Sequence, residues 1–474
     1  MRALLLLTLL CVAALSRADA PAPPRLRSTP ESREELGVTV YSGGFGLIRE
    51  TRTLALSKGR SELEFGGVAG TIQPETVQVH AVGAAAPLRV LEQSYQYDLL
   101  SPAKLLEKYL GRTVRVLRFS ESKGRDEELD ATVLSAGEPP ILRIGDEITW
   151  AYPGRISFPE IPKTLIARPT LVWLLESPAE RQKVEVSYLA GALSWRADYV
   201  LVVNDADTAG DLNGWVTLEN RSGAPYPNAR LQLVAGDVNR VRAELLQDRG
   251  VYAAESRAPM APPQFREEGL FEYHLYTLDR PSSLLDQEQK QISLLEASGV
   301  ALEKRLVLRG EPAYFRMPTG EIGSHSKVSV SLEFDNRASQ HLGLPLPKGI
   351  VRVYKRDESG GRQFLGEDEI EHTPRDERVR IRVGDAFDVV GERKQMDYEQ
   401  IGSCRSESAW QIDLRNHKDE KIDVDVVEPA SGDWEIVSSS HKATKDDAQS
   451  FRFLVNVPAR GSARIEYRVR IRWC

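Results

Sequence analysis

Residues of alternating polarity recur from one end of the chain to the other, and this pattern constrains the fold more than any other feature. In the last alternating segment one face carries the apolar side chains of Ile465, Tyr467, Val469, Ile471 and Trp473. The intervening residues are charged, and similar alternation occurs at 328–334 and 422–426. Period two places successive side chains on opposite faces of a strand, so each strand buries one face and exposes the other. The pattern predicts a mostly β protein built from multidomain antiparallel β-sandwiches.

Helix signals are few by comparison. Ser101 and Pro102 form an N-cap and first-turn pair ahead of the sequence AKLLEKYL, and Gly111 provides a stop signal. These residues predict a short helix over 102–110. The stretch 283–297 has leucines and an isoleucine at helical spacing but a weak polar face, so it fits either a second helix or two strands.

The stretch YSGGFGLIRE, residues 41–50, places three glycines within four positions and invites comparison with phosphate-binding loops. A dinucleotide-binding motif that starts at Gly44 needs a glycine where Arg49 stands, and a P-loop needs a lysine after Gly46, where Leu47 stands. The residues that follow alternate as a strand does and provide no helix N-terminus for a phosphate. The glycines therefore predict a turn or bulge between two strands.

The N-terminus predicts export. Arg2 precedes an apolar run at 3–15, and Ala18-Asp19-Ala20 matches a signal-peptide cleavage site. The run is too short to span a bilayer, and no later segment approaches the ~18 uninterrupted apolar residues of a membrane helix. Residue 10 is a leucine, whereas a lipoprotein signal needs a small residue before Cys11. We expect residues 1–20 to be a signal peptide and the mature protein to be soluble, in either the periplasm or the extracellular space.

Charge and cysteine content limit the possible partners. The full sequence has a net charge of −7, and removal of residues 1–20 makes the net charge one unit more negative. A chain of this charge does not show the excess of basic residues that is typical of proteins that bind nucleic acid or anionic lipid. Processing leaves Cys404 and Cys474, which either pair in an oxidising compartment or remain two free thiols. The seven histidines form neither HxH nor HExxH, and CxxC is absent, so the sequence predicts no metal and no cofactor.

Several long stretches of mixed composition carry a family resemblance. In chain order they are VEVSYLAGALSWRADYVL (184–201), GWVTLENRSGAPYPNARLQLVAGDVN (214–239), LGLPLPKGIVRVY (342–354), GEDEIEHTPRDERVRIRVGDAFDVVGERKQ (366–395) and LRNHKDEKIDVDVVEPASGDWEI (414–436). They resemble, in the same order, the bacterial proteins of the mucoidy-inhibitor type, which carry a domain of unknown function. Residues 396–398 depart from that family, with Met-Asp-Tyr in place of Thr-Asp-Phe. The resemblance implies an envelope-associated β-protein without an agreed activity, and the family name points to an influence on exopolysaccharide output.

The chain is expected to contain four regions. Residues 1–20 are the signal peptide, 21–36 a disordered linker, 37–169 an N-terminal β-domain and 170–474 the β-sandwich domain or domains of the family. Within the N-terminal domain, one helix followed by closely spaced strands at about 103–150 resembles a small SH3- or Sm-like barrel. Within the family domain, residues 240–269 are rich in alanine, proline and charge, and they predict a long mobile loop.

The densest polar group of the family domain consists of His372, Asp388, Glu392 and Arg393, joined by Asn416 and His417. One interpretation is structural: the acidic residues pair with the arginines of RVRIRV (378–383), and the polar residues fasten turns. The other interpretation is a polar recognition patch, for instance for sugar hydroxyls. The segment AGDVN (235–239) is interpreted as a strand end capped by Asp237 and Asn239.

Two classes of function follow. The first is a non-catalytic envelope protein that presents surfaces to a protein or glycan partner, and the second is a hydrolase of cell-envelope polysaccharide. The first is favoured because the sequence supplies no G-x-S-x-G elbow, no metal motif and no phosphate site. Carboxylate pairs are too frequent in this chain to indicate a glycosidase. We expect no catalytic residues and no nucleic-acid partner, and the oligomeric state and the identity of the partner remain open.

Overall fold

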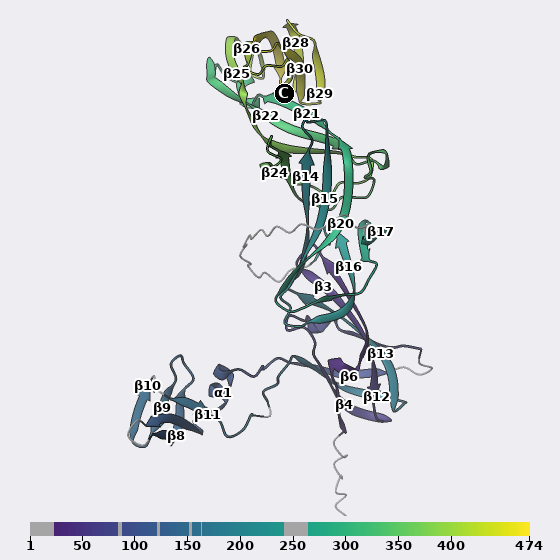
Figure 1. The fold of residues 1–474 in the computed structure, drawn as a ribbon, viewed down its shortest axis with the longest axis vertical. Helices are drawn as coiled ribbons and strands as arrows, with labels where there is room; N and C mark the ends of the chain where they lie inside the picture. The colour runs from purple at the N-terminus through teal and green to yellow at the C-terminus, as the bar shows by residue number, and fades with distance from the viewer. Residues whose placement is uncertain (1–22, 84–87, 121–123, 151–153, 163, 241–263) are drawn as a thin grey trace, which may run out of the picture. The chain divides into compact units, whose positions relative to one another are not determined.

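The computed structural model describes residues 23–474 apart from 84–87, 121–123, 151–153, 163 and 241–263. Its strands form five sheets, and the described residues contain one short α-helix (Figure 1). The prediction of a mostly β protein is therefore confirmed. No helix in this part of the chain is long and apolar enough to cross a membrane. The predicted signal peptide and most of the predicted mobile loop lie outside the described residues.

The chain folds into two compact units, Met1–Leu36 with Ile48–Ala190 and Gly37–Leu47 with Gly191–Cys474. It passes from one unit to the other inside three long strands, which are β2 (Arg33–Tyr41), β3 (Phe45–Ala55) and β13 (Arg181–Gly191). These strands belong to a sheet of order β17-β18-β16-β2-β3-β13-β5. The other strands of this sheet are β5 (Gln78–Ala81), β16 (Tyr226–Ala235), β17 (Phe265–Leu270) and β18 (Tyr273–Leu278), and β19 (Ser282–Leu284) pairs with β16.

A four-stranded sheet of order β1-β4-β12-β6 lies in the first unit. Its strands are β1 (Arg25–Ser28), β4 (Gly59–Gly66), β6 (Arg89–Gln96) and β12 (Thr170–Ser177). The expected disordered linker over 21–36 is thus corrected, because β1 pairs in parallel with β4 and β2 already begins at Arg33. Arg25 also forms ion pairs with Glu62 at 2.8 Å and Glu64 at 3.0 Å. The sequence RLRS has little apolar character of its own, so contacts with β4 hold this strand.

A smaller sheet of order β10-β9-β8-β7-β11 follows one short helix in the first unit. Its elements are α1 (Pro102–Lys108), β7 (Thr113–Ser120), β8 (Arg125–Ser135), β9 (Ile141–Ile144), β10 (Glu147–Trp150) and β11 (Arg155–Ser157). The helix is confirmed, and the Ser101 side chain caps it by accepting a hydrogen bond from the Lys104 amide at 3.2 Å. The expected SH3- or Sm-like barrel is not closed in the described residues. Its two edge strands, β10 and β11, have only four and three residues and pair with β9 and β7 alone.

Two further sheets complete the second unit. The five-stranded sheet, of order β20-β15-β14-β23-β24, contains β14 (Leu193–Val203), β15 (Ala209–Asn220), β20 (Glu288–Ala301), β23 (Gly349–Arg356) and β24 (Arg362–Ile370). The nine-stranded sheet, of order β28-β31-β26-β25-β22-β21-β27-β30-β29, contains β21 (Glu303–Arg309), β22 (Glu321–Asp335), β25 (Arg378–Gln400), β26 (Arg405–Asn416), β27 (Ile422–Pro429), β28 (Asp433–Ser439), β29 (Ala443–Asp447), β30 (Ser450–Val457) and β31 (Ser462–Arg472). The ambiguous stretch 283–297 lies in β19 and β20, so it forms two strands and not a helix.

Several strand pairs are parallel, so the sheets are mixed and not purely antiparallel as predicted. β14 pairs in parallel with β23, β16 with β2, and β21 with β27. Each of these pairs joins strands that are distant in the sequence. Alternation determines which face of a strand a side chain takes, but it carries no information about the direction of a distant neighbour.

The nine-stranded sheet folds over itself around one core. The ring of Phe451 on β30 lies 5.7 Å from that of Tyr467 on β31 and 5.2 Å from that of Trp434 on β28. These strands stand near opposite ends of the sheet order, so the two halves of the sheet share the same apolar interior. On β31 the predicted inward face is confirmed, since Ile465, Tyr467, Val469 and Ile471 are buried. The fifth residue of the pattern, Trp473, lies just beyond the strand and is half-buried.

Cys404 and Cys474 form a disulfide, which decides between the two alternatives left open by the sequence. Their Cα atoms lie 5.7 Å apart, and the Trp473 amide donates a hydrogen bond to the Cys404 carbonyl at 3.0 Å. The adjoining strands β26 and β31 pair from Arg405 and Arg472 onward. The sheet itself therefore brings the two cysteines together, and the disulfide fixes the open end of this strand pair.

We expect the double substitution Cys404→Ser with Cys474→Ser to lower the free energy of unfolding by about 2–4 kcal/mol, because the unfolded chain then loses its covalent constraint. The two cysteines are 70 residues apart, so the constrained loop is long. Urea denaturation followed by circular dichroism measures the change. Reduction of the native protein with dithiothreitol should reproduce it, and unchanged midpoints in both experiments would contradict the expectation.

Candidate functional site

The structure places two of the six predicted patch residues inside the nine-stranded sheet. Arg393 on β25 is 2% exposed, and its guanidinium binds the carboxylate of Glu428 on β27, which is fully buried, at 2.8 and 2.9 Å. Asn416 at the end of β26 donates from its side-chain amide to the carbonyls of Glu420 at 2.8 Å and Pro458 at 3.0 Å. Both side chains therefore hold the fold together and are not available to a ligand.

Three other patch residues, Asp388, Glu392 and His417, are not buried and lie on the outer side of the nine-stranded sheet. The His417 amide donates to the Asp388 carbonyl at 2.8 Å, and both side chains are exposed. Glu392 is half-buried and accepts a hydrogen bond from Arg415 at 2.9 Å. Arg393 and Glu392 are neighbours on β25, so alternation sends their side chains to opposite faces. This separation divides the predicted patch.

The expected ion pairs of the RVRIRV arginines involve different carboxylates. Arg378 and Arg380 bind Glu333 on β22 at 3.2 and 2.6 Å, and Arg382 binds Asp385 at 3.0 Å. The pairing with Asp388 and Glu392 is therefore corrected. Glu333 comes from the facing strand β22, whose register with β25 could not be known from the sequence, and Asp385 lies on β25 itself, three residues after Arg382.

The sixth patch residue, His372, has different neighbours. Its Nδ1 accepts a hydrogen bond from the Lys348 amide at 3.0 Å. Burial lowers the pKa of His372 below its usual value, and the nearby carboxylate of Asp237 opposes this shift. The nearby His274 also lowers the pKa of His372. The structure thus brings His372 to the segment AGDVN, which the sequence predicted to be a capped strand end.

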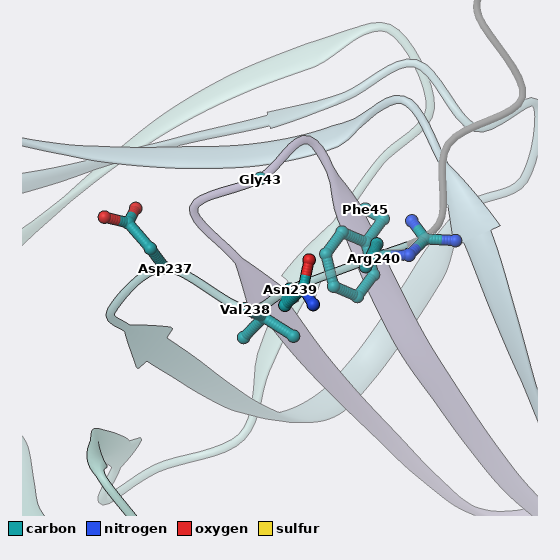
Figure 2. Close-up of a pocket in the computed structure, with 6 residues that line it drawn as sticks. All are labelled: Gly43, Phe45, Asp237, Val238, Asn239 and Arg240. Atoms are coloured by element: carbon teal, nitrogen blue, oxygen red, sulfur yellow. The ribbon is translucent and has the colours of Figure 1, made fainter.

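A cavity of about 370 Å³ lies beside this segment in the second unit (Figure 2). It is lined by Gly43, Phe45, Asp237, Val238, Asn239 and Arg240. Figure 2 shows Phe45, Asn239 and Arg240 gathered below the turn that carries Gly43, whereas the Asp237 carboxylate points away from them. The cavity therefore combines an apolar ring with polar side chains of three kinds.

The glycine-rich turn and the end of β16 build the cavity together. The turn is confirmed between β2 and β3, and Gly44 adopts φ +81°, a conformation that strains most other residues. The rings of Tyr41 and Phe45 stack across it with centroids 4.5 Å apart. The Ser42 hydroxyl donates to the Gly236 carbonyl at 3.1 Å. These contacts fasten the turn to the segment that supplies the polar side chains.

The guanidinium of Arg240 covers the second face of the Phe45 ring, with its central carbon 4.2 Å from the ring centroid. Tyr41 stacks on the same ring, and Phe45 is buried. A cation over an aromatic face is attractive and keeps the arginine in a defined position. Phe45 therefore serves as the floor of the cavity and positions Arg240.

The hairpin of β17 and β18 borders the cavity segment. The ring of Tyr273 packs against Gly236 so closely that a Cβ there would lie 2.5 Å from the ring. Phe271, in the turn of the hairpin, is 90% exposed, and its ring centroid lies 6.4 Å from that of Tyr273. Sequence reasoning did not identify these aromatic residues, because the segment LFEYHLYTL reads as an ordinary strand.

Two imidazoles beside Asp237 are held in defined tautomers. His274 Nδ1–H donates to Glu267 at 2.8 Å, and Glu267 also accepts from Arg375 at 2.7 Å. Because His372 accepts at Nδ1, its Nε2 carries the proton. The site thus offers an imidazole N–H, a carboxylate and an amide. Among the described residues, no group of three or more His, Cys, Asp or Glu side chains is arranged to hold a metal ion.

Comparisons with known proteins do not add a relative. No protein-family model matches the chain, and no curated protein matches it.

Proposed function

We propose that this protein is an exported, non-catalytic component of the bacterial cell envelope that presents a recognition surface to a protein or glycan partner. The observation that carries the proposal is the cavity lined by Gly43, Asp237, Asn239 and Arg240, because it places hydrogen-bonding groups around an apolar floor. Small-ligand and recognition sites combine a concave apolar surface with a few oriented polar groups in this way. An influence on exopolysaccharide output is part of the proposal.

Two observations support export. The sequence of residues 1–20 has the n-region, short apolar run and small-residue pattern of a signal peptide. Cys404 and Cys474 are paired, and disulfides persist mainly in oxidising compartments such as the periplasm and the extracellular space.

Membership of the mucoidy-inhibitor-type family is a proposal that rests on the five long stretches between residues 184 and 436. We also propose that the folded-over nine-stranded sheet is one of the β-sandwiches expected from that family. The ring contacts of Phe451 across the sheet support this description.

A hydrolase acting on envelope polysaccharide is the second candidate. One observation favours it, since Glu267 orients the His274 imidazole by a hydrogen bond at 2.8 Å, as a general base requires. The His274 side chain is 43% exposed, so its second ring nitrogen can be reached from solvent. Release of reducing sugar ends from purified envelope polysaccharide, lost on His274→Gln, would favour this candidate over the first.

Site-directed photocrosslinking in cells tests the proposed recognition surface. We expect a photoreactive amino acid at Asn239 to give an adduct with a defined envelope component, because this exposed residue lines the cavity. The same amino acid at Glu358, an exposed position in the turn between β23 and β24, is the control. Mass spectrometry identifies the adduct. The proposal would be contradicted if Asn239 gave no adduct, or if both positions gave the same adducts.

A further inference from the structure

Phenylalanine is an unusual residue for the turn position that Phe271 occupies. It occupies the turn between β17 and β18 with φ +58°, a left-handed conformation that glycine, asparagine and aspartate adopt far more readily than phenylalanine. Its ring is also 90% exposed, so the hairpin gains almost no buried apolar area from it. Backbone strain and an exposed ring are two costs at one position. A residue with both costs is a candidate for a role in binding.

The exposed ring is continuous with the polar groups of the cavity segment. Phe271 contacts Tyr273, and the Tyr273 ring packs on Gly236, which immediately precedes Asp237. Asp237 and Asn239 are exposed, and the Asp237 carboxylate points away from Phe45 and Arg240 (Figure 2). An aromatic platform and the exposed polar side chains of Asp237 and Asn239 therefore form one strip on the surface of the second unit.

We propose that this strip, formed by Phe271, Tyr273, Asp237 and Asn239, binds a neutral saccharide. The inference rests on the proposed recognition function and names its ligand. One face of a pyranose ring presents C–H groups, which pack on an aromatic ring, and its edge presents hydroxyls that both donate and accept hydrogen bonds. A carboxylate accepts from such hydroxyls, and an amide both donates and accepts, so the strip matches both parts of the sugar.

The exposed carboxylates of the strip and of its hairpin disfavour an anionic ligand. Asp237 is joined by the exposed carboxylates of Glu268 and Glu272 on the neighbouring hairpin. The cation of the cavity, Arg240, lies over the Phe45 ring. A uronate or sulfated sugar would meet like charge here, which costs binding energy. A strip of four residues also suits a small ligand, whereas a protein partner needs roughly 800 Å² of interface on each side.

Affinity electrophoresis of the full chain tests the inference. The gels contain dextran, galactomannan or hydroxyethyl cellulose as neutral probes and alginate as the anionic probe. We expect at least one neutral polymer to retard the protein and alginate not to do so. Phe271→Asn, which keeps a residue suited to the left-handed turn, and Asp237→Ala should each weaken the interaction about tenfold, or ~1.4 kcal/mol.

Phe387→Ala is the matched control, because Phe387 on β25 is 95% exposed and is remote in sequence from the strip. Circular dichroism confirms that the variants fold. The inference is overturned if no neutral polymer retards the native chain, if alginate retards it more strongly, or if the Phe271 and Phe387 variants behave alike. If the saccharide tests fail in any of these ways but Asn239 crosslinks specifically to a protein, the sugar ligand is refuted and the proposed recognition function is still supported.

Discussion

Replacement of Arg393 by methionine is expected to lower the free energy of unfolding by about 3–5 kcal/mol at pH 8. Arg393 is 2% exposed, and its partner Glu428 is fully buried. Two contacts, at 2.8 and 2.9 Å, join the guanidinium to the carboxylate. Removal of the guanidinium leaves a buried carboxylate without its counter-charge, and this unpaired group is the source of the loss.

The loss should depend on pH in a defined direction. Burial raises the pKa of Glu428 to about 7, whereas Arg393 and Tyr467 oppose the shift. A carboxyl whose pKa is higher in the folded state binds its proton more tightly there, so its contribution to stability falls as pH rises from about 4.5 to 7. Without Arg393 the pKa rises further. The substitution should therefore cost little at pH 5, where Glu428 is neutral, and most at pH 8.

Urea denaturation at pH 5 and pH 8 measures both parts of this prediction. Lys394→Met is the matched control, because Lys394 is the next residue on β25, is about half exposed and forms a long ion pair with Glu321 at 3.5 Å. It should cost no more than ~1 kcal/mol. The double variant Arg393→Met with Glu428→Leu should recover most of the stability and lose the pH dependence. An equal loss at both pH values would show that packing, and not charge, makes Arg393 important.

The burial of Arg393 is an example of a feature that could not be predicted from the sequence. Alternation along β25 correctly implies that Glu392 and Arg393 face opposite sides, but it does not state which of two charged residues faces inward. The answer depends on Glu428, which lies on β27 and is 35 residues away. A charged residue looks like part of an exposed face until its distant partner is known. For this reason the predicted patch combined residues of the core with residues of the surface.

Local signals were more informative where one segment determines its own structure. The cap at Ser101, the turn at Gly44 and the inward face of β31 were all predictable, because neighbouring residues carry the information. The candidate site differs in this respect. It joins a turn near residue 43, a strand end near 237 and a hairpin near 271, and the parallel pairing of β16 with β2 brings the first two together. Periodicity does not reveal such a distant parallel pair.

The second large effect is expected in the first unit, at Glu50. Its carboxylate is fully buried and accepts hydrogen bonds from Arg33 and from Arg52, the latter at 3.0 Å. Arg52 is also fully buried, donates to the Gly66 carbonyl at 3.1 Å and lies 3.7 Å above the Phe65 ring. The two guanidinium groups therefore share one carboxylate. Burial lowers the pKa of Arg52, and the charge of Glu50 and its hydrogen bond counteract this shift.

Glu50→Gln keeps the shape of the side chain and removes its charge. We expect a loss of about 3–5 kcal/mol, because two buried or nearly buried cations then lack a counter-charge. Thermal and urea unfolding by circular dichroism measure the loss, which should be larger in the single variant than in Glu50→Gln combined with Arg52→Met. In the double variant only Arg33, whose side chain is 10% exposed, keeps its charge.

Glu176→Gln provides the matched control for this substitution in the same unit. Glu176 pairs with Arg89 at 3.4 Å, and both side chains are well exposed, at 41% and 69%. Water and salt screen such a pair, so its loss should change stability by no more than ~1 kcal/mol. If Glu50→Gln were as mild as Glu176→Gln, the three-residue cluster would not depend on its central charge. If Glu50→Gln with Arg52→Met were less stable than Glu50→Gln alone, the contacts of Arg52 with Gly66 and Phe65 would outweigh the cost of its buried charge.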